Sequence, residues 1–90
     1  MWVDAWDQAQ VVHENRKYIG GEGTYGNEGF VAFENMQGDL IWAMFFDCTN
    51  PIKILKIEDN RLIGITEHSE SQIEINLNEL TDIKYTIYDQ

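Results

Sequence analysis

The chain has 90 residues, of which 16 are acidic and six are basic, so its formal net charge at pH 7 is −10. This length allows one domain, and a hydrophobic content of 43% with three Trp, four Tyr and four Phe is enough for a packed core and argues against disorder. The negative charge repels nucleic acid and anionic membranes and attracts cationic partners. Solubility alone is the alternative reason for such acidity.

The sequence contains no recognisable export or membrane signal. The stretch MWVDAWDQ, residues 1–8, has no basic segment and carries two Asp where a secretory signal needs an apolar run. The longest apolar run, LIWAMFF at residues 40–46, is too short to span a bilayer. The single cysteine, Cys48, cannot form an internal disulfide. Together these features favour a cytosolic, reducing compartment.

Residues 1–18 are predicted to form a helix. The prediction rests on four side chains spaced by four, three and four positions, as on one helix face: Trp2, Trp6, Ala9 and His13. Early aspartates and late basic residues suit the helix dipole, and the glycine pair at residues 20–21 would end the helix. A short strand over residues 9–12 is the alternative interpretation.

From Gly29 onward the pattern changes to that of antiparallel strands. Apolar and polar residues alternate in short segments separated by polar turns, as in strands with one wet face. Six strand segments are expected: GFVAFEN (29–35), LIWAMFF (40–46), IKILKIE (52–58), RLIGITE (61–67), QIEINLN (72–78) and IKYTIY (83–88). Because LIWAMFF is apolar on both alternations, it is predicted to be a central strand covered on both faces.

These elements predict an α+β fold for a single domain over residues 1–90. The N-terminal helix would pack on a meander-like antiparallel sheet of about five to six short strands. Residues 19–28 would form a glycine-rich loop between the helix and the sheet.

The glycine-rich loop contains GEGTYG, residues 21–26, which matches the G-x-G-x-x-G pattern of nucleotide-binding loops. A protein-kinase loop lies between two strands and is followed by a lysine, whereas here the preceding segment is predicted helical and Glu34 takes the lysine position. Glu22 and Glu28 flank the loop and would repel phosphate. We therefore interpret the glycines as a flexible connection and expect no nucleotide cofactor.

No catalytic or metal-binding motif is recognised either. Cys48 has no local signature that would pair it with His13 or His68. In EHSES, His68 lies between Glu67 and Glu70, which could hold it protonated, but such a segment is more often a polar turn. The spacing motifs of metal sites are absent. We expect a protein that is not an enzyme and holds no metal or cofactor.

The small size, the acidity, the missing export signal and the pairing of GFVAFEN with LIWAMFFDCTNP resemble small immunity proteins of bacterial toxin systems. The resemblance is of general type and assigns no residue. Proteins of this kind are cytosolic inhibitors that cap a toxin domain, often a nuclease with a cationic substrate groove. The resemblance thus implies an acidic binding protein with a basic protein partner.

The candidate partner-binding residues lie in the two most polar loops. They are Glu22, Tyr25, Glu28, Glu67 and Glu70. Tyr25 is the expected aromatic anchor, because interface binding energy concentrates on Tyr, Trp and Arg.

Two alternative functions remain open at this point. The C-terminal segment IKYTIYDQ, residues 83–90, could act as an edge strand that pairs with another copy in a homo-oligomeric module. A small ligand-binding domain with an aromatic pocket of Trp2, Trp6 and Trp42 is the other alternative. The protein would accordingly be a monomer or a homodimer.

Overall fold

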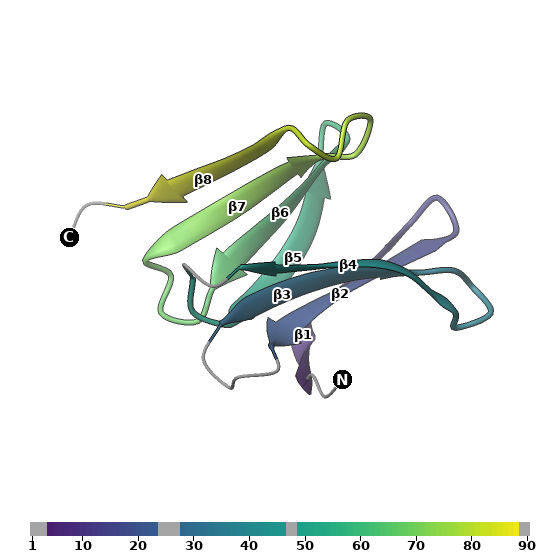
Figure 1. Ribbon diagram of the computed structural model, residues 1–90, viewed down its shortest axis with the longest axis horizontal. Helices are drawn as coiled ribbons and strands as arrows, with labels where there is room; N and C mark the ends of the chain where they lie inside the picture. The colour runs from purple at the N-terminus through teal and green to yellow at the C-terminus, as the bar shows by residue number, and fades with distance from the viewer. Residues whose placement is uncertain (1–3, 24–27, 47–48, 89–90) are drawn as a thin grey trace.

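The computed structural model describes residues 4–23, 28–46 and 49–88, which form eight strands and no helix (Figure 1). The strands are β1 (Asp4–His13), β2 (Arg16–Glu22), β3 (Gly29–Glu34), β4 (Leu40–Phe46), β5 (Ile52–Glu58), β6 (Arg61–Thr66), β7 (Ser71–Asn76) and β8 (Ile83–Ile87). In these three ranges there is consequently no helix with the length and apolarity needed to cross a membrane.

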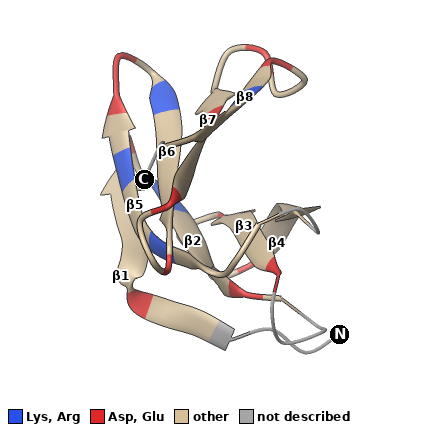
Figure 2. Ribbon diagram, turned by 90° about the vertical axis from the view of Figure 1, so that its left-hand side faces the viewer, with Lys and Arg blue, Asp and Glu red and all other residues tan. Residues whose placement is uncertain are grey.

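The eight strands form two four-stranded antiparallel sheets, each a meander. The orders are β1-β2-β3-β4 and β5-β6-β7-β8. The sheets meet where β5 packs against β1 and β2, and they diverge from that junction, with β4 and β8 at their far edges (Figure 2). The small single domain is therefore all-β and rich in antiparallel sheet, which corrects the predicted α+β class.

The predicted helix over residues 1–18 is wrong. Of these residues, 4–13 form β1 and 16–18 begin β2, and the two strands form a hairpin; residues 1–3 lie outside the described part of the chain. The strand over residues 9–12, which was the alternative interpretation, lies inside β1. The pairing of β1 with β2 shifts register between Ala5 and Gln10. Because of this irregularity Trp6 and Ala9, three positions apart, both contact the core. The bulge thus gives the core-facing residues of β1 the spacing that a helix face would have.

The N-terminal hairpin turns on two residues in the left-handed region, Glu14 and Asn15, with φ of 52° and 63°. The β5–β6 hairpin turns in the same way at Asp59 and Asn60, with φ of 51° and 60°. Two-residue turns of this geometry match the twist of the adjoining strands. Residues 19–22, predicted to be loop, continue β2 instead of linking a helix to the sheet.

The segments expected after Gly29 coincide with β3 to β8, but the predicted place of LIWAMFF in the sheet is wrong. It forms β4, an edge strand and not a central one. Only one of its faces packs on the core, through Trp42, Met44 and Phe46. On the other face Phe45 stacks on Phe30, with ring centroids 6.1 Å apart, and remains 40% exposed.

The core lies between the sheets at the β1–β5 junction. Its buried members are Ala9, Tyr18, Val31, Ile52, Leu55, Leu62, Ile73 and Ile75. Ile52 is fully enclosed and fits against two glycines: a Cβ at Gly20 of β2 would lie 3.3 Å from Ile52 Cβ, and one at Gly64 of β6 would lie 3.2 Å from Ile52 Cγ2. One side chain of β5 thus fastens the second sheet to the first.

Candidate functional site

Three chain connections meet at one end of the molecule, which we call the loop end: the β2–β3, β4–β5 and β6–β7 connections. A Cβ at Gly29, where β3 begins, would lie only 2.7 Å from the carbonyl oxygen of Asn50 in the β4–β5 connection. The side-chain amide of Asn50 in turn donates a hydrogen bond of 2.8 Å to Glu70 Oε1 in the β6–β7 connection. Figure 1 shows the β4–β5 and β6–β7 connections side by side at the lower left. The loops predicted to carry the site therefore lie at the same end.

The β6–β7 corner is held by one buried hydroxyl group. Thr66 Oγ1 donates to the carbonyl oxygen of Ser71 at 3.0 Å and accepts from the Ser71 N–H at 3.2 Å. The Ser71 hydroxyl lies 3.1 Å from the same oxygen, and both side chains are buried. These contacts close the corner at its base, so that residues 67–70 project from a fixed frame.

Glu70 is half-buried within this corner. Burial alone would raise the pKa of its carboxyl, but hydrogen bonds, the largest of them from Asn50, and the nearby His68 outweigh burial and lower the pKa below its ordinary value of 4.5. The carboxylate is thus kept ionised, and it ties the corner to the β4–β5 connection.

We expect the charge of Glu70 to contribute to stability in a pH-dependent way. Since its pKa is lower in the folded than in the unfolded protein, the contribution is complete above about pH 4.5 and is lost as the pH falls through the lowered value. Glu70→Gln should therefore lower the melting temperature at pH 7, and its gap to the unaltered protein should narrow in acid. Asn50→Ala should behave similarly, and a gap independent of pH would contradict this role.

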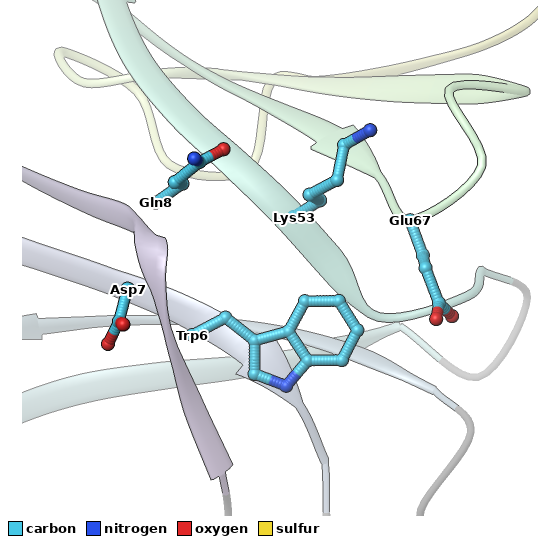
Figure 3. A pocket seen from close by; sticks show the side chains of 5 residues that line it. All are labelled: Trp6, Asp7, Gln8, Lys53 and Glu67. Carbon is cyan, nitrogen blue, oxygen red and sulfur yellow. The ribbon is translucent and has the colours of Figure 1, made fainter.

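An open pocket of about 380 Å³ lies beside the corner and is lined by Trp6, Asp7, Gln8, Lys53 and Glu67. Figure 3 shows the indole of Trp6 extending from β1 beneath Lys53 toward the Glu67 carboxylate, while the Lys53 ammonium points away from the ring. Lys53 Nζ donates a hydrogen bond of 3.4 Å to Ser69 Oγ. We call this site the Trp6 pocket; it combines an aromatic surface with the Glu67 carboxylate, while the Asp7 side chain points away from the ring.

Glu67 and His68 carry accessible ionisable groups of the corner. Their side chains are 39% and 72% exposed, and His68 Nε2 lies 3.7 Å from Glu67 Oε2. Glu67 also donates its backbone N–H to the Pro51 carbonyl oxygen at 2.8 Å, so its position is fixed by the β4–β5 connection.

The other predicted contact residues differ in accessibility. Glu22 is half-buried at the end of β2. Glu28 is only 7% exposed, and its side chain lies so close to Gly23 that a Cβ there would come within 2.4 Å of Glu28 Oε1. Glu28 thus offers little surface to a partner. Tyr25, the expected anchor, lies outside the described residues.

The glycine motif joins β2 to β3, so the segment before it is a strand and not a helix. That difference removes one of the arguments against a kinase-like loop. The other arguments against a kinase-like loop still hold. In particular, Glu34 occupies the position of the kinase lysine, and it pairs across the sheet with Lys17. Residues 24–27 of the motif are outside the described part of the chain.

The residues considered for catalysis and ligand binding are dispersed. His13 is at the β1–β2 turn, 3.8 Å from Glu14, whereas His68 belongs to the loop end; Cys48 is not among the described residues. Trp42 packs against Tyr18 and Phe33, away from the lining of the Trp6 pocket. Within residues 4–23, 28–46 and 49–88, no three His, Cys, Asp or Glu side chains gather as a metal site requires.

Comparison of the chain with protein-family models, with curated proteins and with solved structures finds no match. The candidate site is therefore argued from the geometry of this chain alone. From the sequence, Trp6 is expected on a helix face or, as an alternative, in an aromatic pocket with Trp2 and Trp42. The pocket in the structure contains Trp6 without Trp42, and it arises where the bulged β1 lies beside β5 and the β6–β7 corner. Trp2 lies outside the described residues.

Proposed function

We propose that this chain is an acidic binding protein whose loop end caps a basic protein partner, in the manner of an immunity protein that inhibits a toxin nuclease domain. The observation that carries the proposal is the Trp6 pocket, where an indole ring extends toward the carboxylate of Glu67 and Asp7 is a further acidic residue of the lining. Such a pocket suits an arginine or lysine side chain of a partner.

The charge around the pocket supports this assignment. The loop end, taken together with the strand residues that adjoin it, contains six acidic residues and a single Lys or Arg, which is Lys53. The count covers residues 4–8, 20–23, 28–29, 49–53 and 67–70. The Lys53 ammonium is directed to Ser69 and away from the indole. A cationic partner would therefore be attracted to this end, and complementary charge of this kind raises association rates by about ten- to a thousand-fold.

The pocket also explains how binding energy would be concentrated. A guanidinium placed over the Trp6 ring would gain about 0.5–2 kcal/mol from the cation–π interaction. The same cation would be within reach of the Glu67 carboxylate, which is partly exposed and held by the corner. Trp6 thus takes the anchoring role that the sequence assigned to Tyr25.

The test uses the product of the adjacent upstream gene as the partner and measures association and dissociation rates. Glu67→Lys should slow association by about ten-fold at low salt, and the effect should shrink as salt screens the charges. Glu14→Lys is the matched control, since it makes the same charge change at the opposite end of the β1–β2 hairpin. Trp6→Ala should speed dissociation by about ten-fold or more, with Trp6→Phe intermediate.

If Glu67→Lys and Glu14→Lys slow association equally, the acidic residues serve solubility and do not form a localised interface. Normal dissociation of the Trp6→Ala variant would remove the pocket from the interface. Melting temperatures of all four variants show whether a kinetic change reflects binding or a loss of fold.

A further inference from the structure

Strand β8 has an exposed apolar face at the edge of its sheet. Ile83 and Tyr85 lie opposite the core residues Ile75 and Ile73 of β7, so they point to the inner face of the sheet. Even so, Ile83 and Tyr85 are each 41% exposed and Ile87 is 66% exposed. The reason is visible in Figure 2: the sheets diverge, and β8 lies far from the β1–β5 junction.

The backbone of β8 presents hydrogen-bonding groups to the outer edge. Asp82 and Tyr88, on either side of the strand, bond toward β7 through the Asp82 carbonyl at 3.1 Å and the Tyr88 N–H at 2.9 Å. Backbone direction alternates along an antiparallel strand, so the even-numbered residues between them also face β7. The odd-numbered residues, from Ile83 to Ile87, therefore direct their N–H and C=O groups outward.

We propose that two copies of this chain associate by antiparallel pairing of β8 with β8 of the second copy, about a twofold axis at Tyr85. In this register Ile83 lies opposite Ile87 of the other copy at both ends of the strand, and the outward backbone groups of the two strands meet. Lys84 lies opposite Thr86, so no like charges face each other. The pairing joins two four-stranded sheets into one sheet of eight strands.

Charge selects this edge for self-association. Two copies that each carry a net charge of −10 repel, so a contact between them requires a surface poor in acidic groups. The one charged residue of β8 is Lys84, which lies opposite Glu74 of β7. Self-pairing at β8 therefore brings no acidic residue of one strand against its counterpart.

The apolar edge strand β4 is the competing surface, and its geometry is less suitable. Its pairing with β3 shifts register between Phe33 and Glu34, so the strand is irregular near Leu40. Irregular edges pair poorly with a further strand. The pairing of β7 with β8 is unbroken over all five residues of β8, which leaves a regular outer edge.

The expected dimer is weak. Five residues per copy cover less than the roughly 800 Å² per partner that is usual in stable complexes, so we expect a dissociation constant in the micromolar range. Sedimentation velocity from low micromolar to near-millimolar concentration should show a reversible shift from monomer to dimer. The proposal is independent of the partner proposed above, and this experiment requires no partner.

Two double variants test the register. Ile83→Lys with Ile87→Glu places opposite charges across both ends of the pairing and should keep the dimer. Ile83→Lys with Ile87→Lys places like charges there and should weaken it by about ten-fold or more. The second variant carries less net negative charge, so non-specific association between acidic chains would give the reverse order.

A third variant, Ile87→Pro, removes an outward N–H without removing a donor to β7, and it should abolish the dimer while the circular dichroism spectrum is retained. It also serves if the charged variants fail to fold. A monomer at every concentration of the unaltered protein, equal association of the two double variants, or loss of the dimer through Phe45→Lys on β4 instead would each overturn the proposal.

Discussion

The Ile52→Ala variant is expected to lose about 3–5 kcal/mol of its free energy of unfolding, out of the roughly 5–13 kcal/mol usual for a domain of this size. Ile52 is fully buried, and its side chain on β5 lies against Gly20 of the first sheet and Gly64 of the second. Truncation would leave a cavity between two backbones that cannot approach each other further. The sheets would thereby lose their main point of attachment.

Urea denaturation followed by tryptophan fluorescence measures this loss. Ile54→Ala is the matched control, because Ile54 lies on the same strand but is only partly buried and is not part of the core cluster. The control should lose about 1 kcal/mol or less. Equal losses in the two variants would mean that the contact between the sheets does not depend on Ile52.

The strands after Gly29 could be predicted from the sequence because their signal is local. Alternation in segments such as SQIEIN of β7 records which residues face the core, and the burial of that strand alternates residue by residue. The sequence of strand β1 shows no such regular alternation over its whole length. Its register shift between Ala5 and Gln10 exists only against β2, and it moves Trp6 and Ala9 onto one face at a spacing that a helix would also produce.

The position of a strand within its sheet is likewise not written in its composition. LIWAMFF has the apolarity of a central strand, yet β4 has a neighbour on one side in the described chain. Its inner residues pack on the core, whereas Leu40 and Ile41 are 61% and 53% exposed. Which strand lies beside which is decided by the whole chain, so apolarity alone predicted the wrong place.

The candidate site could be predicted only in part, because sequence patterns report local features and not long-range contacts. The polar loops could be found from composition, but their meeting at one end depends on long-range contacts, such as the hydrogen bond from Asn50 to Glu70. Accessibility also depends on the fold: Glu28 looked like a surface residue and is enclosed beside Gly23. Trp6 became a site residue only because β1 lies against β5 and the corner.

The second large effect is expected at Thr66. Valine has almost the same shape as threonine, so Thr66→Val removes the hydroxyl while keeping the packing. The N–H and C=O of Ser71 would then lose their partner at a fully buried position, and each unsatisfied group costs about 1–3 kcal/mol. We therefore expect a loss of about 2–6 kcal/mol in the free energy of unfolding.

Thr66→Ser distinguishes the contribution of the hydroxyl from that of the methyl group. It keeps the hydrogen bonds and removes one buried carbon, at a cost of about 1 kcal/mol. Hydrogen exchange of the Ser71 amide gives a local readout: exchange should speed up strongly in Thr66→Val and little in Thr66→Ser. If the two variants exchange alike, the hydroxyl does not hold the corner. If only Thr66→Val opens the β6–β7 corner, the position of Glu67 beside the Trp6 pocket depends on the Thr66 hydroxyl, which is buried and touches no partner. In that case Thr66→Val should also weaken partner binding.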